Sequence, residues 1–163
     1  MKPVAVTAAV VFLLDQVTKI AVVHGMRLDQ VGAIDVLPPW LQFRMAWNQG
    51  VNFGLLSNEA DVARWGLIVL ALGISAWVWV WIGKSRHGRL ARIGAGLLIG
   101  GALGNVIDRI LYGAVADFLN MGLPGFQNPY SFNVADIAIF AGALALVLFA
   151  GEAKPPAKRR EAP

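Results

Sequence analysis

The sequence contains no cysteine and little charge. The absence of Cys among 163 residues excludes disulfides, thiolate nucleophiles and Cys-ligated metals. Two histidines are present, His24 and His87, and they lie too far apart in the chain to form a metal site by themselves. Carboxylates, hydroxyls and lysines remain for chemistry, so we expect no metal and no cofactor.

Charged residues make up only 15% of the chain, whereas 57% of the residues are hydrophobic. With a mean hydropathy of +0.60, this composition is typical of an integral membrane protein rather than of a soluble domain of the same length. The net charge is +4, but the basic residues fall in short clusters beside apolar runs and not on one amphipathic face. This distribution indicates membrane topology and predicts no nucleic-acid partner.

Four apolar segments are long enough to cross a bilayer, which takes about 20 residues. They cover residues 4–24, 64–83, 92–113 and 133–151. The first segment could be read as a secretory signal, but Asp15 and Lys19 interrupt it and no small-residue cleavage site follows. We therefore predict an all-α membrane protein with four transmembrane helices, the first of them retained.

Basic residues flank the spans on one side, and such flanks stay in the cytoplasm. They are Lys2, Lys84, Arg86, Arg89, Arg92, Lys154, Lys158, Arg159 and Arg160. The opposite connection 114–132 has no Lys or Arg, and 25–63 has only Arg27 and Arg44. Both termini are predicted to be cytoplasmic. Residues 1–153 form one predicted membrane domain, and 154–163 a disordered basic tail.

The connection 25–63 has features of a small outer-face structure. In "LQFRMAWN", residues 41–48, apolar and other side chains alternate as in a half-buried strand, which predicts a small β-sheet on the outer face. The segment 51–58 is predicted to lie in the membrane interface as a helix between the first two spans. Gly96, Gly100 and Gly104 in the third span form a face on which another helix can pack closely.

Polar residues converge on one depth near the outer leaflet, as the rise of about 1.5 Å per helical residue shows. They are Asp15, Lys19, Asn105, Asp108, Arg109, Asp117 and Asp136. Each ionisable group inside a span costs about 2.5–3.5 kcal/mol on insertion scales, so such groups usually face the bundle interior or water. The cluster therefore predicts a functional site in the outer layer.

Each of these residues also has a structural interpretation. Asp15 and Lys19 are spaced i, i+4 and could form a simple pair on one helix face. Asn133 and Asp136 have the spacing of a helix N-cap and its N3 residue, so capping alone could account for them. Asp117 could be an ordinary loop acid, although its neighbours in "AVADFLNMG" are mostly apolar.

Two acids at one depth favour acid–base chemistry, because neighbouring carboxylates share a proton and can hydrolyse a peptide bond without a metal. No serine lies in a nucleophile elbow or at helical spacing from Lys19. A small transporter or channel is the alternative, but it needs polar groups through the whole membrane depth. A purely structural scaffold would not account for the two outer acids.

Five short motifs follow one another along the chain. They are "DQVTK" at 15–19, "NQGVNFG" at 48–54, "GNVIDR" at 104–109, "VADF" at 115–118 and "FNVAD" at 132–136. In this order they resemble the lipoprotein signal peptidases, signal peptidase II, of bacterial inner membranes. The resemblance implies that Asp117 and Asp136 are the catalytic aspartates. It implies site-shaping or substrate-binding roles for Asp15, Lys19, Asn48, Gly50, Asn105, Arg109 and Asn133.

The same resemblance implies a substrate and a location. The family cleaves diacylglyceryl-modified prolipoproteins just before the lipidated cysteine, and its members lie in the inner membrane with the active site near the periplasmic face. The outer sheet would act as a cradle and the segment 51–58 as a clamp over the substrate. Membrane lipids and cyclic peptide inhibitors of the globomycin type are the other implied partners.

Overall fold

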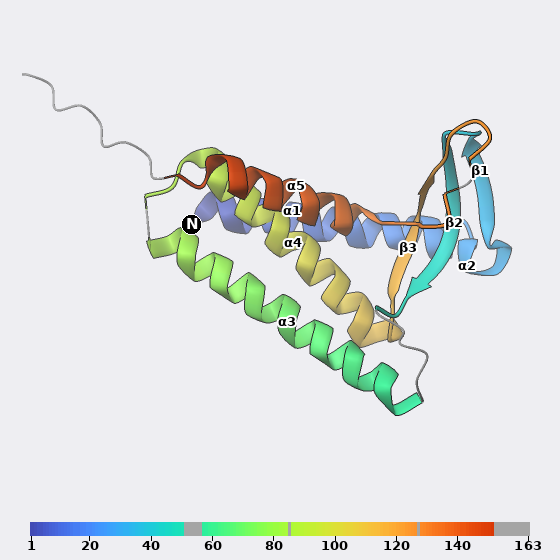
Figure 1. The fold of residues 1–163 in the computed structure, drawn as a ribbon, viewed down its shortest axis with the longest axis horizontal. Coiled ribbons are helices and arrows are strands. Elements are labelled where there is room, and N and C mark those ends of the chain that lie inside the picture. Colours follow the sequence, from blue (N-terminus) through green and yellow to red (C-terminus); the bar gives the residue numbers. More distant parts are fainter. Residues whose placement is uncertain (51–56, 85, 127, 152–163) are drawn as a thin grey trace, which may run out of the picture.

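The computed structural model describes residues 1–50, 57–84, 86–126 and 128–151, without the side chains of 57–60. Most of the described chain is helical, and a small sheet lies at one end of the helices (Figure 1). The helices are α1 (Lys2–Lys19), continued by a π-helical turn η1 (Ile20–Gly25), α2 (Leu28–Val31), α3 (Ser57–Lys84), α4 (Arg89–Tyr112) and α5 (Val134–Phe149). The strands are β1 (Ala33–Leu37), β2 (Leu41–Asn48) and β3 (Val115–Met121).

Three helical stretches are long and apolar enough to cross a membrane: Lys2–Gly25, Asp61–Lys84 and Arg89–Tyr112, each of 24 residues. They correspond to the first three predicted spans. The helix in the fourth predicted span, α5, has 16 residues and so covers about 24 Å, less than the roughly 30 Å of a bilayer core. Three apolar spans are thus found, and the fourth stays a prediction.

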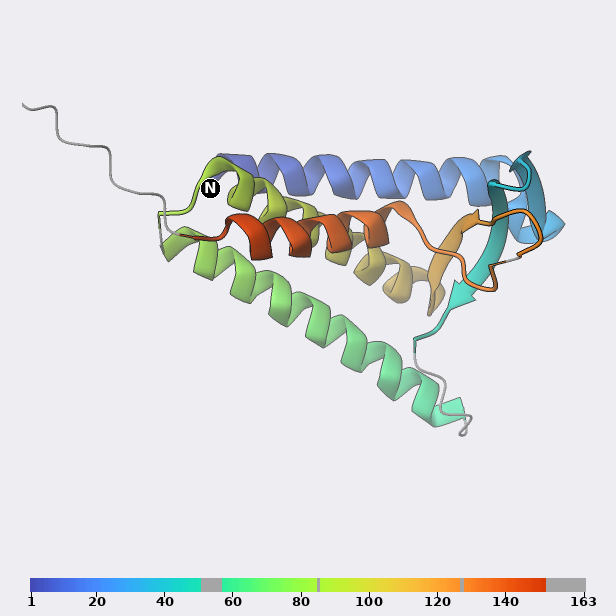
Figure 2. The same cartoon turned by 45° about the horizontal axis from the view of Figure 1, so that its top comes forward.

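Helix α4 packs between α1 and α5 through its glycines. A Cβ on Gly96 would lie 2.7 Å from the Val4 carbonyl oxygen, and one on Gly100 would lie 2.9 Å from the Ala8 Cα, so neither position has room for a side chain. The predicted glycine face therefore packs within the bundle, against α1. Helix α3 slants away from the other three toward the sheet end (Figure 2).

The sheet is antiparallel with the order β1-β2-β3. The strand predicted for 41–48 is confirmed with the same bounds. Our expectation that 114–132 is only a connection is wrong, because 115–121 pairs with β2 as its third strand. Both faces of this strand are largely buried, so the sequence lacks the alternation that marks a half-buried strand.

The sheet rests on the end of the first helix. Phe118, Val23 and Leu28 are almost completely buried in one cluster, against which Phe43 and Ile34 pack. This contact attaches the strand that carries Asp117 to the segment following α1. The predicted interfacial segment 51–58 and the tail 154–163 lie largely or wholly outside the described residues.

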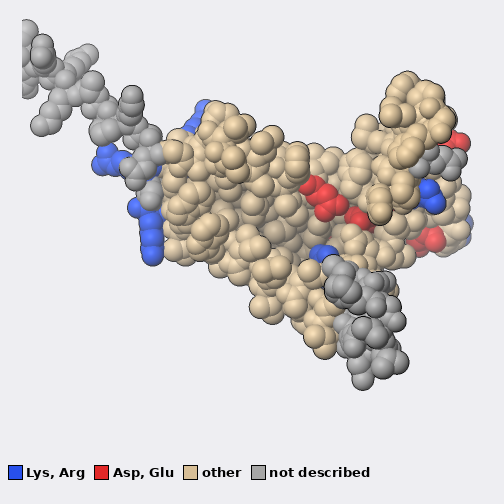
Figure 3. Space-filling view, in the orientation of Figure 1, with Lys and Arg blue, Asp and Glu red and all other residues tan. Residues whose placement is uncertain are grey.

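The two ends of the molecule differ in charge (Figure 3). A group of Lys and Arg side chains lies at the end that holds the N-terminus and the α3–α4 connection. Acidic side chains reach the surface where the helices meet the sheet. The basic flanks thus gather at one end of the helices, and the membrane orientation that they predict stays a prediction.

Candidate active site

A buried lysine lies at the centre of the polar layer. The Nζ atom of Lys19 lies 2.8 Å from Oδ2 of Asp15 and 2.7 Å from Oδ2 of Asp108, and it donates to Oδ1 of Asn105 at 3.2 Å. All four side chains are buried. The predicted i, i+4 pair therefore exists, but α4 supplies a second carboxylate and an amide to the same ammonium group. One buried cation joins α1 to α4.

Asp15 and Asp108, the two acids beside Lys19, also bind the elements that carry Asp117 and Asp136. Asp15 Oδ1 accepts from the backbone N–H of Ala135 at 3.0 Å, in the first turn of α5. Asp108 Oδ2 accepts from the backbone N–H of Ala116 at 3.1 Å, in β3. Gln16 donates to both acids at 3.1 Å. Since Asp117 follows Ala116 and Asp136 follows Ala135, this network positions both predicted catalytic residues.

Asp136 occupies the first turn of α5. Asn133 and Asp136 form a complete capping box: Asp136 N–H donates to Asn133 Oδ1 at 2.9 Å, and Asn133 N–H donates to Asp136 Oδ2 at 3.2 Å. The other carboxylate oxygen, Oδ1, accepts from Asn105 Nδ2 at 2.9 Å. The capping interpretation is therefore correct, and the same carboxylate also contacts a side chain of the polar layer.

Asp117 is buried on β3 and has two amide donors. Asn133 Nδ2 donates to its Oδ1 at 2.6 Å, and Asn48 Nδ2 donates to its Oδ2 at 3.0 Å. Asn133 thus contacts both aspartates, Asp117 through its amide nitrogen and the Asp136 backbone through its amide oxygen.

Burial raises the pKa of Asp117 to about 6, and the neighbouring carboxylate of Asp136 acts in the same direction. The hydrogen bonds from Asn48 and Asn133 oppose this rise because they stabilise the ionised form. The group therefore exchanges its proton closer to neutral pH than an ordinary aspartate does.

The other predicted residues lie around this pair. Asn48 Oδ1 accepts from Gly50 N–H at 2.9 Å, and Gly50 has φ +92°, a conformation that favours glycine. Arg109 donates to the Asn105 carbonyl at 3.3 Å, while its buried Nε has no partner among the described residues. The fold brings Asp15, Lys19, Asn105 and Asn133 into one connected network with both acids.

Three residues of this region had no predicted role. Asp108 and Gln16 belong to the Lys19 network. Arg64 of α3 donates to the carbonyls of Arg109 and Ile110 at 2.7 and 3.1 Å in the last turn of α4, where the Arg109 carbonyl also accepts from the Gly113 N–H. Asp108 was predicted in the polar layer without a separate role, and Gln16 could have been found from its polarity inside a predicted span. No spacing rule pairs Arg64 with residues more than forty positions away.

The arrangement suits proton transfer at two carboxyl groups. Asp136 is partly exposed and Asp117 is buried, so the pair has one side open to a reactant. The described ranges contain no group of three His, Asp or Glu side chains that could hold a metal ion. Two such acids can activate water directly, one accepting a proton while the other donates one.

Fold and site together define a membrane enzyme. Two solved structures described as bacterial membrane enzymes superpose on the chain with TM-scores of 0.74 and 0.77, at 27% and 26% identity. Each superposition covers 91% of this chain, and 87% and 92% of the respective structure. The helical bundle with its small sheet is therefore an enzyme fold already seen in bacterial membranes.

The chain belongs to the signal peptidase II family, whose model, described as signal peptidase (SPase) II, matches residues 7–150. The lipoprotein signal peptidase of Rhodopseudomonas palustris is 42% identical over 142 residues, which is 85% of each chain. That of Burkholderia mallei is 38% identical over 138 residues, 85% of this chain and 81% of the relative. The protein is a membrane peptidase, and these findings do not support the transporter alternative.

Proposed function

We propose that the protein removes the signal peptide from diacylglyceryl-modified prolipoproteins, with Asp117 and Asp136 as an aspartyl dyad. The observation that carries this proposal is the shared amide of Asn133, which contacts one acid from β3 and the other from α5. A helix cap alone would not require a second buried acid on the same asparagine. The raised pKa of Asp117 further supports a proton-transfer role.

The proposed reaction needs one ionised and one protonated carboxyl group. The ionised carboxylate takes a proton from a water molecule, whose oxygen attacks the carbonyl carbon before the lipidated cysteine. The protonated carboxyl group then donates to the cysteine nitrogen, and the C–N bond breaks. The signal peptide leaves with a new carboxylate, and the mature lipoprotein leaves with a free amine. One water is consumed and the dyad regains its proton.

The neighbouring side chains act on the acids rather than on the peptide bond. Asn48 and Asn133 orient the Asp117 carboxylate, and Asn105 orients that of Asp136. Asp15 holds the Ala135 backbone beside Asp136, and Lys19 holds Asp15. Gly50 permits the turn after Asn48, and Arg109 lies beside Asn105. These contacts support the predicted site-shaping roles.

The proposed orientation follows from the separation of charges. We place both termini in the cytoplasm of a bacterial inner membrane, α5 as a fourth span, and the sheet as a cradle at the periplasmic face. Basic side chains at the end opposite the sheet support this orientation. A lipid-bearing substrate would then enter sideways from the outer leaflet, and globomycin-type cyclic peptides would compete for the same place.

The test is cleavage of a diacylglyceryl-modified prolipoprotein by the purified protein in detergent. Asp117→Asn and Asp136→Asn should each reduce the rate by at least about a hundredfold while the proteins stay folded. Asp61→Asn is the matched control, because Asp61 is an exposed acid at the start of the α3 span. Full activity of a folded Asp136→Asn variant would show that this acid is only a cap and that the mechanism is wrong.

A further inference from the structure

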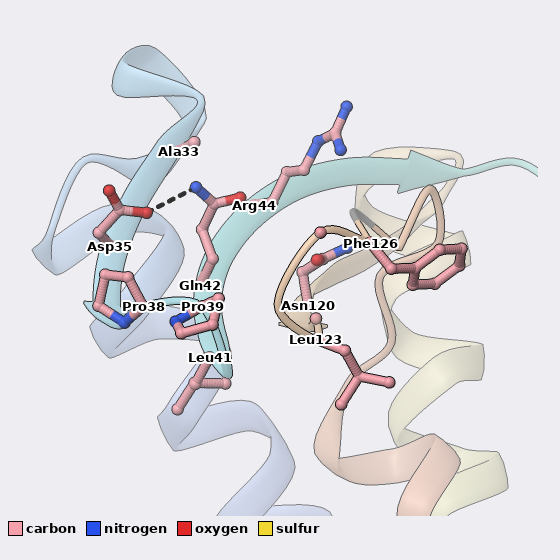
Figure 4. A pocket seen from close by; sticks show the side chains of 12 residues that line it. Ala33, Asp35, Pro38, Pro39, Leu41, Gln42, Arg44, Asn120, Leu123 and Phe126 are labelled. Carbon is pink, nitrogen blue, oxygen red and sulfur yellow. Dashed lines mark hydrogen bonds between the residues drawn. The ribbon is translucent and has the colours of Figure 1, made fainter.

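A concavity lies on the sheet, away from the two acids. It has a volume of about 730 Å³, within the range of roughly 300–1,000 Å³ that ligand sites have. Figure 4 shows it between β1 with the Pro38–Pro39 turn on one side and the segment following β3 on the other. Its lining includes Asp35, Gln42, Arg44, Asn120, Leu123 and Phe126.

Backbone contacts fix the walls of this pocket. Gly122 N–H donates to the Trp40 carbonyl at 3.2 Å, and a Cβ at Gly122 would lie 2.7 Å from the Pro39 carbonyl oxygen. Leu123 and Phe126 exchange backbone hydrogen bonds of 3.2 and 2.9 Å, which closes the turn between them. The two walls are thus tied together at their base, and the pocket is part of the fold.

The lining suits a polypeptide better than an anionic group. The lining carries one positive side chain, Arg44, and one negative side chain, Asp35, so their charges cancel. Asp35 Oδ1 accepts from Gln42 Nε2 at 2.7 Å (Figure 4). A lipid phosphate would meet the carboxylate as well as the guanidinium group. An extended peptide offers one N–H and one C=O per residue, which amide side chains such as Gln42 can bind, and its side chains can pack on Leu123 and Phe126.

The pocket lies within reach of a chain that leaves the dyad. Asp117 and Asn120 are three residues apart on β3, about 10 Å along the strand at its usual rise, with their side chains on opposite faces of it. A substrate held with its cysteine at the dyad would therefore reach the pocket no earlier than about its third following residue. The signal peptide must run toward the membrane, so only the mature part of the substrate can extend toward the sheet.

We infer that this pocket binds the first residues of the mature polypeptide that follow the lipidated cysteine. The inference rests on the proposed function, since it takes the substrate and the dyad from it. Binding there would add contacts to substrates of sufficient length without touching the reacting bond. The effect on kcat/KM should therefore depend on how far the substrate continues beyond the cysteine.

The test compares two diacylglyceryl-modified peptides that continue for about two or about eight residues beyond the cysteine. The wild-type protein should cleave the longer one with a kcat/KM about tenfold higher, as one or two added hydrogen bonds would give. Ala33→Trp, which fills the pocket from β1, should abolish this advantage and leave the short peptide unaffected. Val36→Trp, exposed on the same strand outside the pocket, should keep it.

Three outcomes would overturn the inference. Equal cleavage of both peptides by the wild type would show that the pocket takes no substrate, while the proposed function would stand. Equal loss on both peptides in Ala33→Trp, and again in Phe126→Ser as a second variant, would show a structural role only. An Ala33→Trp effect that followed the anionic lipid content of the micelles would indicate a headgroup site. Cleavage of neither peptide by the wild type would refute the proposed function itself.

Discussion

The same two helices, α1 and α4, meet in two different ways along their length. Toward the N-terminus of α1 they form an apolar core, in which Val4 and Ala95 are completely buried together with Ile82 of α3. Toward the sheet they meet through Lys19, Asp15 and Asp108. Close packing sets the distance between the helices, while the ionic contacts set which side chains point at β3 and α5. The apolar half thus keeps α1 and α4 close together, and the ionic half orients the side chains near β3 and α5.

Loss of the Lys19 ammonium group should have the largest effect on stability and activity. Lys19→Met keeps the length of the side chain but leaves Asp15 and Asp108 buried without their cation, which should cost about 3–5 kcal/mol of unfolding free energy and remove activity. Thermal unfolding in detergent measures the first effect and prolipoprotein cleavage the second.

Lys84→Met is the control for this variant, since Lys84 is an exposed lysine at the end of α3. A further Asp15→Asn substitution in the Lys19→Met protein should recover part of the stability. If Lys19→Met were as stable as the wild type, the ionic contacts would not be needed to hold the outer half together.

The apolar half can be disrupted without changing the ionic contacts. Gly100→Val would place a Cβ 2.9 Å from the Ala8 Cα and force α1 and α4 apart, at a cost of about 1–3 kcal/mol. Gly73→Val is the control, because no atom lies within 4 Å of a Cβ at that helical position of α3. Equal stability of the two variants would contradict the close packing of α1 on α4.

The pH dependence of stability tests the raised pKa of Asp117 in the polar half. Because the pKa of Asp117 is raised from 3.8 to about 6 in the folded protein, the folded state binds more protons between these values than the unfolded state does. This contribution is fully present below pH 4 and is lost as pH rises through about 6, by roughly 1–3 kcal/mol.

Asp117→Asn should therefore lose less stability between pH 4 and pH 7 than the wild type does. Denaturant unfolding in mild detergent at both pH values measures the difference. Parallel pH profiles for the two proteins would show that Asp117 has an ordinary pKa.

Substitutions of Asn133 should change stability least, and they separate its two roles, the cap of α5 and the amide donor to Asp117. Asn133→Ser retains an oxygen that can cap α5 but lacks the amide that donates to Asp117, so it should lose less stability than Asn133→Ala does while its cleavage rate falls. Asn133→Ala should lose about 1 kcal/mol as well as activity. A fully active Asn133→Ser variant would mean that the bridge between the two acids is not needed.

The sequence by itself determined those features that depend on neighbours along the chain. Hydrophobic length predicted the three long spans, period-2 alternation predicted β2, and the spacing of Asn133 and Asp136 predicted the capping box. These succeed because burial of one face, or capping of one helix end, is decided within a few residues.

The tertiary structure alone decided which distant residues meet. It placed Asp117 on a third strand rather than in a loop, gave Lys19 a second carboxylate from Asp108, and put the Asn133 amide between two acids from separate elements. Such contacts depend on the rotation of each helix about its axis and on the register of β2 against β3. Both are set by packing of the whole bundle, because no short turn joins β2 to β3 to fix their register and the rotation of a helix depends on the helices around it.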